Sequence, residues 1–475
     1  MKKNNFFSIL LAAVLLFGLF APPAAAQAGD TSPAPAGSAG GPEAAFDAAI
    51  SIAAPELTCG AAILVDGDND EILFARNAHQ RLYPASITKI MTNLLVLEAV
   101  ERGQLSLDQE ITASSAAIAA VSADSSSQNI QPGEVMTVRN LMYCALIASA
   151  CEACNVLAEA VAGSISEFVD RMNQRAAELG MTDTHYANPH GLHDPQHYTS
   201  AYDVYLVAHE AMKHDTFRTI VSTAKHEVPA TNISGTRVLY NTNALINNWF
   251  IQGYTYSKAI GIKTGSTPEA GYCLTSAAVD PAGRTFYCVV LNAQVVKEAD
   301  GTVTRYQFKE SRELLEWGFQ NFQRISLLDE SADLWEVQVT LSDEQDHVVV
   351  QPKGSIVRTM PTDFDPEKVE LIPVLPDSVE APVEAGQTLG SVTLSYNGET
   401  YGTLDLVTVS GAARSETQYR LKVFKEYVDL WWVKALIAAV GVLLVALVVL
   451  AVAVSRGRRR RSRGYHYSGN RRRRY

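Results

Sequence analysis

The sequence predicts a mixed α/β domain, followed by a small all-β domain and a C-terminal transmembrane helix. Three observations predict this order. Strand-like and helix-like stretches are mixed between about residues 45 and 325, which is typical of helices packed on a sheet. Short alternating strands, separated by Asp, Gly, Pro and Asn turns, fill residues 333–410, as in a β-sandwich. Residues 433–454 are then almost entirely apolar and long enough to span a bilayer.

The N-terminus has the order of a secretory signal peptide. In residues 1–26, two lysines precede an apolar run that ends in small residues, with cleavage predicted after Ala26. A membrane anchor is the alternative, but the charge and cleavage-site pattern favours a signal. Residues 27–44 are rich in Pro, Gly, Ala and Ser and predict a flexible linker. We therefore expect an exported protein.

The C-terminal apolar stretch predicts a single membrane span. Trp431 and Trp432 stand at its near boundary, where indole rings prefer the membrane interface. Residues 455–475 form a basic tail with runs of arginine. Such runs also occur in nucleic-acid-binding proteins, but beside a span the positive-inside rule accounts for them. We therefore expect attachment to the cell membrane, a cytoplasmic tail, folded domains outside the cytoplasm and no nucleic-acid partner.

Charge is divided sharply along the chain. All 51 Asp and Glu lie between residues 27 and 430, whereas 13 of the 39 Lys and Arg lie in the signal, beside the span or in the tail. The exported part is thus strongly acidic, which argues against a polyanionic partner. An anionic substrate would have to be held by a few local cations.

The cysteines and histidines do not predict a metal site. Disulfides remain open for the six cysteines, because the compartment is oxidising, but several lie in apolar runs where free cysteine acts as a small hydrophobe. Cys151 and Cys154 have the spacing of half a zinc site, but no second pair completes it. The turn at residues 66–70 lacks the Gly and Glu of a calcium loop. Four histidines show no fixed ligand spacing and are expected to be structural: His185, His190, His193 and His197. We expect no metal and no cofactor.

The first candidate for chemistry is YPASITKIMT, residues 83–92. Ser86 and Lys89 are three positions apart, so on a helix the hydroxyl and the amine share one side and can meet. A serine at a helix start is also an ordinary cap, and the same spacing recurs at Ser222 and Lys225. The spacing alone therefore leaves a nucleophile–base pair and a plain helix start both open.

Two further elements carry candidate residues. Residues 141–163 predict a helix, a break near Ser149 and a second helix, although a serine at such a break is commonly a cap. Residues 261–273, GIKTGSTPEAGYC, lead into a predicted strand. Their Lys-Thr-Gly offers a cation, a hydroxyl and a glycine that lets a ligand approach the backbone. Each element alone has a structural interpretation.

Together, in this chain order, the three elements match the signature of the penicillin-recognising serine enzymes. The chain closely resembles the serine-type D-alanyl-D-alanine carboxypeptidases, the low-molecular-mass penicillin-binding proteins. The resemblance covers nearly the whole exported part and includes long segments: ILFARNAHQRLYPASITKIMT, ANPHGLHDPQHYTSAYDVYLVAHEAMK, NTNALI and GIKTGSTPEAGYCLTSAA. It implies a β-lactamase-like transpeptidase fold for residues 45–325, a peptidoglycan stem peptide ending in D-Ala-D-Ala as substrate, and β-lactam antibiotics as inhibitors.

The resemblance also implies the catalytic roles. Ser86 would attack the carbonyl of the penultimate D-alanine and form an acyl-enzyme, which water then hydrolyses. Lys89 would be the general base, and Ser149 would relay the proton to the leaving amine. A free lysine has a pKa of ~10.4, so a second cation, Lys263, is expected to lower the pKa of Lys89 toward ~7–8.

Substrate binding follows from the same resemblance. Lys263 and Thr264 would hold the terminal carboxylate, with Gly265 beside them. The backbone N–H groups of Ser86 and Ser266 would hold the oxyanion. Removal of the terminal D-alanine would limit cross-linking in the cell wall.

One position departs from the family pattern. The second motif is usually Ser-x-Asn, whereas Cys151 stands two residues after Ser149. An amide both accepts and donates hydrogen bonds, while a thiol does both weakly, and a thiolate near Lys89 would be oxidisable. The alternatives are therefore a catalytically weak protein that binds wall peptides and, with less support, a β-lactamase. The Glu-x-x-Leu-Asn segment of class A β-lactamases is missing.

Overall fold

The computed structural model describes residues 52–122, 125–331, 334–396 and 398–463. The predicted signal (1–26) and linker (27–44), and the last part of the predicted tail (464–475), lie outside the described residues.

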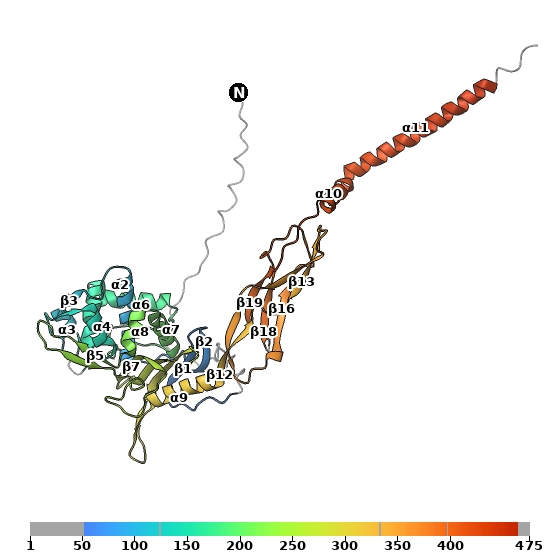
Figure 1. The fold of residues 1–475 in the computed structure, drawn as a ribbon. Coiled ribbons are helices and arrows are strands. Elements are labelled where there is room, and N and C mark those ends of the chain that lie inside the picture. The colour runs from blue at the N-terminus through green and yellow to red at the C-terminus, as the bar shows by residue number, and fades with distance from the viewer. Residues whose placement is uncertain (1–51, 123–124, 332–333, 397, 464–475) are drawn as a thin grey trace, which may run out of the picture. The chain divides into compact units, whose positions relative to one another are not determined.

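An antiparallel five-stranded sheet, in the order β2-β1-β9-β8-β7, forms the centre of the first domain (Figure 1). The strands are β1 (Ala61–Asp66), β2 (Glu71–Arg76), β7 (Ala259–Thr267), β8 (Gly271–Val279) and β9 (Thr285–Ala293). The predicted hairpin is confirmed, because β1 and β2 pair with Asp66 opposite Glu71. Every residue of β1 is buried, so both faces of the sheet are covered.

Alternate side chains of β1 belong to two different cores, as the two-residue period of a strand requires. Ile63 and Val65 pack among helices on one face, whereas Leu64 packs with α9 (Tyr306–Asn321) on the other. The helices of the first face include the two long predicted ones on either side of the break near Ser149. They are α2 (Lys89–Glu101), α3 (Ser115–Ala119), α4 (Val138–Leu146), α5 (Cys151–Ala162), α6 (Ile165–Glu178), α7 (Ala201–Met212) and α8 (Asp215–Ser222).

Among the described residues of this domain, three short two-stranded ribbons lie between the main helices and strands. The pairs are β3 (Glu110–Thr112) with β4 (Val135–Thr137), β5 (Lys225–Val228) with β6 (Arg237–Tyr240), and β10 (Val295–Lys297) with β11 (Val303–Arg305). The ribbon β5–β6 leads directly into residues 241–246, which lie beside the site described below.

The second domain is β-rich, as predicted (Figure 1). It contains a six-stranded sheet in the order β16-β18-β19-β14-β13-β17 and a two-stranded sheet of β12 and β15. The strands are β12 (Phe322–Leu328), β13 (Trp335–Thr340), β14 (His347–Pro352), β15 (Ile356–Pro361), β16 (Val369–Val374), β17 (Ser378–Glu380), β18 (Thr388–Tyr396) and β19 (Glu399–Thr408), with one 3-10 turn, η2 (Pro366–Lys368). Six of these strands were expected. The other two were not, because β12 shows no regular alternation and β17 has only three residues.

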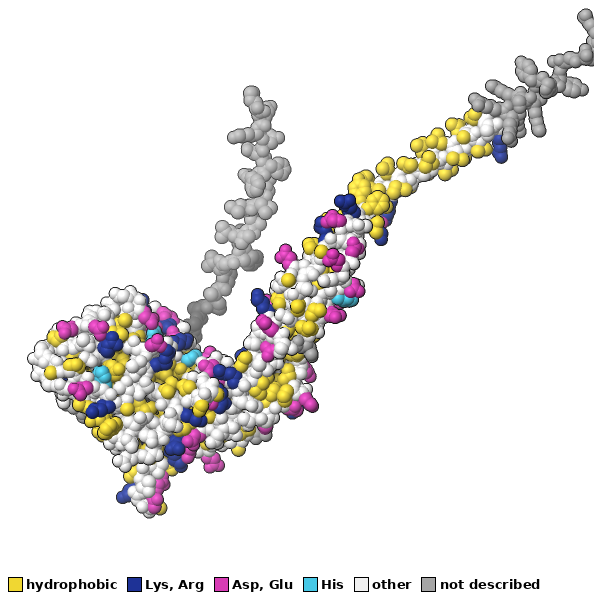
Figure 2. All heavy atoms as spheres, in the orientation of Figure 1, with side chains coloured by type: hydrophobic (Ala, Val, Ile, Leu, Met, Phe, Trp, Pro, Cys, Tyr) yellow, Lys and Arg dark blue, Asp and Glu magenta, His cyan; other side chains and the backbone are white. Residues whose placement is uncertain are grey.

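Two helices end the described chain: α10 (Glu416–Asp429) and α11 (Trp431–Arg463). Within Trp431–Arg456, a window of 18 residues has a mean hydropathy of 3.2, and no residue of that window is buried against protein. Figure 2 shows hydrophobic side chains along the length of α11. The helix is therefore long and apolar enough to cross a membrane, and it includes the predicted span 433–454.

All six cysteines lie in the described residues, and all are buried and unpaired. They pack inside the two cores of the first domain or at its site, so this part of the chain is folded without disulfides. This agrees with the behaviour of free cysteine as a small hydrophobe.

Candidate active site

The first motif forms a short turn that leads into α2. Ser86 lies in a 3-10 turn, η1 (Ala85–Thr88), and Lys89 begins the α-helix. The Lys89 Nζ donates a hydrogen bond of 2.8 Å to Ser86 Oγ, and Lys89 is fully buried. The capping alternative is wrong for Ser86, because the residue at the N-cap of α2 is Thr88.

The repeat of the same spacing at Ser222 has no such geometry. Ser222 Oγ donates to the carbonyls of Arg218 and Thr219 inside α8, while Lys225 is exposed on β5. Only the pair at Ser86 is brought together in a buried setting.

Two glycines press against the turn that carries Ser86. A Cβ on Gly191 would lie 1.8 Å from Ala85 O, and a Cβ on Gly265 would lie 2.8 Å from Pro84 O and 3.0 Å from Ser86 N. No larger residue fits at these contacts without moving the backbone. Ala85 itself has a left-handed φ of 47°, a conformation that a non-glycine residue adopts at a cost of ~1–3 kcal/mol.

Lys89 is held by two further contacts. Its Nζ donates to His190 O at 2.7 Å and lies 3.5 Å from Cys151 Sγ. The His190 carbonyl belongs to a loop in which Asn188 Oδ1 accepts a hydrogen bond from Gly191 N. The amine of Lys89 is thus aimed at Ser86 by groups from two distant segments.

The second motif sits at the predicted helix break, and Ser149 does not cap α5. The N-cap is Ala150, without a side-chain cap, and Ser149 has a left-handed φ of 63°. Ser149 Oγ instead accepts a hydrogen bond of 3.1 Å from Lys263 Nζ. This contact joins the second motif to the third across 114 residues.

The third motif lies on β7 beside the nucleophile. Lys263 is 1 % exposed, and its Nζ also donates to Thr264 O at 3.0 Å. Thr264 is half-buried and Ser266 is exposed. Gly265 lies between them, and because it has no side chain the backbone of β7 can lie against Ser86 N.

Thr242 is a site residue that the sequence analysis did not single out. Its Oγ1 lies 2.6 Å from Thr264 Oγ1, and its N–H donates to Ile147 O at the end of α4. The segment NTNALI was noted as part of the family resemblance, but nothing in those six letters says that its second residue touches the Lys-Thr-Gly strand.

The site buries two lysines, Lys89 and Lys263, whose positive charges repel each other. Burial, and then the positive charge of Lys89, lower the pKa of Lys263 from its ordinary value of 10.5 to about 7. In the described residues, neither Lys89 nor Lys263 forms an ion pair with a carboxylate. The positive charge of Lys89 thus lowers the pKa of Lys263, whereas the expected action of Lys263 on Lys89 stays a prediction.

Cys151 occupies the position where the family pattern has asparagine. It is 2 % exposed, with its Sγ facing Lys89 Nζ and 3.9 Å from Ser149 O. The neighbouring Cys154 is fully buried, and burial raises the pKa of its thiol to about 12. Among the described residues, no group of three His, Cys, Asp or Glu side chains is arranged to hold a metal ion.

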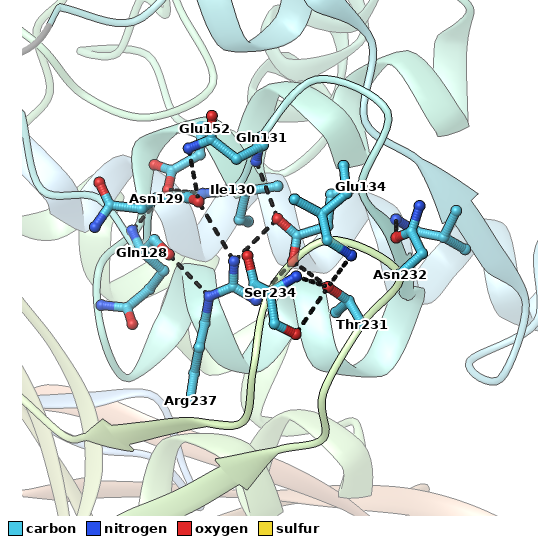
Figure 3. A network of polar contacts seen from close by, with 12 residues as sticks. Gln128, Asn129, Ile130, Gln131, Glu134, Glu152, Thr231, Asn232, Ser234 and Arg237 are labelled. Atoms are coloured by element: carbon cyan, nitrogen blue, oxygen red, sulfur yellow. Dashed lines mark hydrogen bonds and ion pairs between the residues drawn. The ribbon is translucent and has the colours of Figure 1, made fainter.

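A polar network outside the motifs supports the start of α5 (Figure 3). Arg237 pairs with the fully buried Glu134 through bonds of 2.7 and 2.9 Å. Burial alone would raise the pKa of Glu134, but hydrogen bonds from Arg237, Gln131 and Thr231 lower it overall. Arg237 Nε also donates to Gln128 O.

The same loop reaches the second motif through Glu152. Its Oε1 accepts from Gln128 N at 2.6 Å and from Ser127 Oγ at 2.8 Å, as Figure 3 shows for the backbone of this loop. Cys151 N donates to Ser126 O at 2.9 Å. The network therefore fixes the first turn of α5, from which Cys151 projects toward Lys89.

Comparison with known proteins decides the family. Residues 48–295 match the family model described as D-alanyl-D-alanine carboxypeptidase, and residues 322–411 match the model of the penicillin-binding protein 5 C-terminal domain. The chain belongs to the D-alanyl-D-alanine carboxypeptidase family, a family of serine-type hydrolases. It is 32 % identical over 339 residues to D-alanyl-D-alanine carboxypeptidase DacF of Bacillus subtilis, a match that covers 71 % of this chain and 82 % of that protein.

Solved structures agree with this assignment. Penicillin-binding protein 5 of Haemophilus influenzae is similar with a TM-score of 0.60 at 26 % identity, over 76 % of this chain and all of that one. Penicillin-binding protein 6B of Escherichia coli is similar with a TM-score of 0.58 at 27 % identity, over 76 % and 98 %. The mixed α/β domain followed by a β-rich domain is thus shared with these relatives.

Proposed function

We propose that this protein removes the terminal D-alanine from peptidoglycan stem peptides that end in D-Ala-D-Ala, through an acyl-enzyme on Ser86. The observation that carries the proposal is the junction of three distant segments. Lys89 bonds Ser86 at 2.8 Å, Lys263 bonds Ser149 at 3.1 Å, and Gly265 lies against Ser86 N. A nucleophile, a base, a second hydroxyl and a cation are the parts that acyl transfer needs.

The protonation of the two lysines suits this chemistry. The pKa of Lys263 falls to about 7, so Lys263 loses its proton near neutral pH. Where two amines lie this close, a proton belongs to the pair rather than to one residue. A substrate carboxylate bound at Lys263 and Thr264 favours the proton on Lys263. The neutral amine is then Lys89, which already faces Ser86 Oγ.

The steps follow from these positions. Ser86 Oγ attacks the carbonyl carbon of the penultimate D-alanine as its proton passes to Lys89. The oxyanion lies between the N–H groups of Ser86 and Ser266. The C–N bond then breaks, the proton reaches the leaving amine through Ser149, and D-alanine departs. Water hydrolyses the ester, with Lys89 again taking the proton. β-Lactams would acylate Ser86 by the same attack.

Location is part of the proposal. The apolar helix α11 would span the cell membrane, with the two folded domains on the outer side where stem peptides are found. The end of α11 carries arginine, which favours a cytoplasmic C-terminus.

The test is D-alanine release from a peptide ending in Lys-D-Ala-D-Ala, with the full chain in detergent micelles and its Ser86→Ala variant as control. We expect release by the parent and a loss of at least ~10³-fold in the variant, since removing a catalytic nucleophile costs about this much or more. Acylation by a fluorescent penicillin is followed in parallel.

Cys151 supports a second candidate, a protein that binds wall peptides without turning them over. A thiol is a weak donor and acceptor at the place where an amide would contact both Lys89 and the substrate backbone. Penicillin acylation without D-alanine release would select this candidate. Rapid penicillin hydrolysis would select a β-lactamase.

A further inference from the structure

We propose that His197 positions the oxyanion-binding N–H of Ser86 through Thr88 and the carbonyl of Ala85. The inference rests on the proposed function, because it assigns His197 to the machinery of acyl transfer. His197 lies 109 residues from Thr88 in the sequence, and it takes no part in the three motifs.

A directed chain of hydrogen bonds joins the four residues. The backbone N–H of Ala187 donates to His197 Nδ1 at 3.2 Å. An N–H can only donate, so Nδ1 carries no proton, and the neutral imidazole carries its hydrogen on Nε2. His197 Nε2 lies 2.8 Å from Thr88 Oγ1 and therefore donates to it. The Thr88 hydroxyl then donates to Ala85 O at 2.9 Å.

Burial keeps the direction of this chain constant. His197 and Thr88 are each 2 % exposed, and burial lowers the pKa of His197 to about 3. The imidazole is thus neutral at any pH at which the enzyme would work. A buried threonine between two fixed partners has only one way to satisfy both bonds.

The end of the chain is the peptide unit that carries the Ser86 N–H. The bond between Ala85 and Ser86 is trans, so its C=O and N–H point in opposite directions in one plane. A hydrogen bond that fixes the Ala85 carbonyl therefore fixes the direction of the Ser86 N–H. Gly265 of β7 lies against this peptide, since a Cβ on it would come within 3.0 Å of Ser86 N, and the oxyanion site proposed above is at this nitrogen.

This peptide needs outside support. Ala85 has a φ of 47°, and such a strained residue persists only when its surroundings hold it. Gly191 packs against the Ala85 carbonyl from one side, but contact alone does not orient it. The bond from Thr88, which His197 orients, supplies the directional restraint.

The experiment compares two substitutions of His197 in the full chain. His197→Leu removes both hydrogen bonds at similar volume, whereas the amide of His197→Gln can accept from Ala187 and donate to Thr88. We expect His197→Leu to lower kcat for D-alanine release about 10–100-fold with little change in KM, because a misplaced oxyanion donor acts on the transition state. His197→Gln should recover most of the loss. His185→Gln, an exposed histidine of the same region, should leave kcat unchanged.

A transition-state analogue separates positioning from a merely structural role. A peptide boronic acid, with boron in place of the penultimate carbonyl carbon, adds to Ser86 and places an oxygen at the oxyanion position. Its affinity should fall in parallel with kcat in His197→Leu. Unchanged kcat in a folded variant, or a fall in kcat without a fall in boronate affinity, would overturn the inference.

Thr88→Val gives an independent route if His197→Leu does not fold. It removes the middle hydroxyl at equal size, and we expect a loss of kcat and boronate affinity similar to that of His197→Leu. In the double variant the two effects should not add, since both break one chain; additive effects would contradict the chain. If the parent itself neither releases D-alanine nor is acylated by penicillin, the proposed function fails; if the parent is active and the variants equal it, only this inference fails.

Discussion

The catalytic domain buries charge in two different ways. At the nucleophile, Lys89 and Lys263 lie together, and their described partners are hydroxyls, a thiol and carbonyls. Beside α5, Arg237 lies against a fully buried carboxylate, Glu134, with which it forms two hydrogen bonds. The first arrangement lowers the pKa of a lysine, and the second lowers the pKa of an acid.

The difference teaches how a functional charge is distinguished from a structural one. In a buried ion pair each charge is compensated by its partner, so removing one partner mainly lowers the stability of the fold. Two buried lysines without a carboxylate among their described partners are costly, and such a cost is found where a substrate later supplies the missing charge. On this view the lysine pair awaits a carboxylate, while the Arg237–Glu134 pair needs nothing further.

A substitution of Lys263 is expected to have the largest effect and tests directly whether its charge is functional rather than structural. Lys263→Met replaces the cation with an apolar chain of similar length, and we expect kcat/KM for D-alanine release to fall ~10²–10³-fold because the carboxylate loses its partner. The melting temperature should rise slightly, as an uncompensated buried charge has been removed. Lys213→Met, on an exposed lysine, serves as the control for both measurements. A lower melting temperature in Lys263→Met would show that the lysine is a structural charge after all.

Arg237→Met makes the opposite change. It leaves Glu134 buried without its partner, and we expect the free energy of unfolding to fall by ~3–5 kcal/mol. Arg139→Met, which breaks an exposed pair with Asp108, should cost at most ~1 kcal/mol. Urea denaturation of the three proteins measures both values. Equal losses in the two variants would remove the distinction between the buried network and a surface pair.

The pH dependence of catalysis tests the role of the buried lysine pair. The pKa of Lys263 is lowered from 10.5 to about 7, so Lys263 gains a proton as the pH falls through 7, and the lysine pair then loses the neutral amine that Lys263 can supply by taking the proton from Lys89. We therefore expect kcat/KM to fall up to about tenfold per pH unit below 7 and to be level just above it. His190 and His197 do not contribute in this range, since burial lowers the pKa of each to about 3. A profile that is level from pH 5.5 to 8 would contradict the lysine assignment.

The smallest effect is expected at Cys151. Cys151→Asn restores the amide of the usual family pattern beside Lys89, and we expect D-alanine release equal to that of the parent or up to about tenfold higher, because an amide both donates and accepts. Steady-state rates on the D-Ala-D-Ala peptide measure this effect. The control is Cys154→Ala, since Cys154 is also buried but forms no bond to Lys89. A large loss in Cys151→Asn would mean that the thiol has a role of its own.

Much of the fold was predictable because its signals are local. The hairpin of β1 and β2, the helix break before Cys151, the strand β8 that follows the Lys-Thr-Gly segment and six strands of the β-rich domain follow from apolar spacing and turn residues. The strand β17 was missed because it has only three residues, and β12 because its apolar and polar residues do not alternate. Their pairing depends on partners elsewhere in the chain, β15 and β13.

The sequence by itself determined which groups are present and how the nearest of them are spaced: a serine and a lysine on one helical turn, a serine at a helix break, and Lys-Thr-Gly leading into a strand. Only the tertiary structure decided what they do to one another. Ser149 accepts from Lys263 rather than capping a helix, Thr242 joins Thr264, and His197 reaches Thr88. These contacts join residues between 22 and 114 positions apart, and burial, which no local pattern reports, sets the charge of the lysines and the histidines.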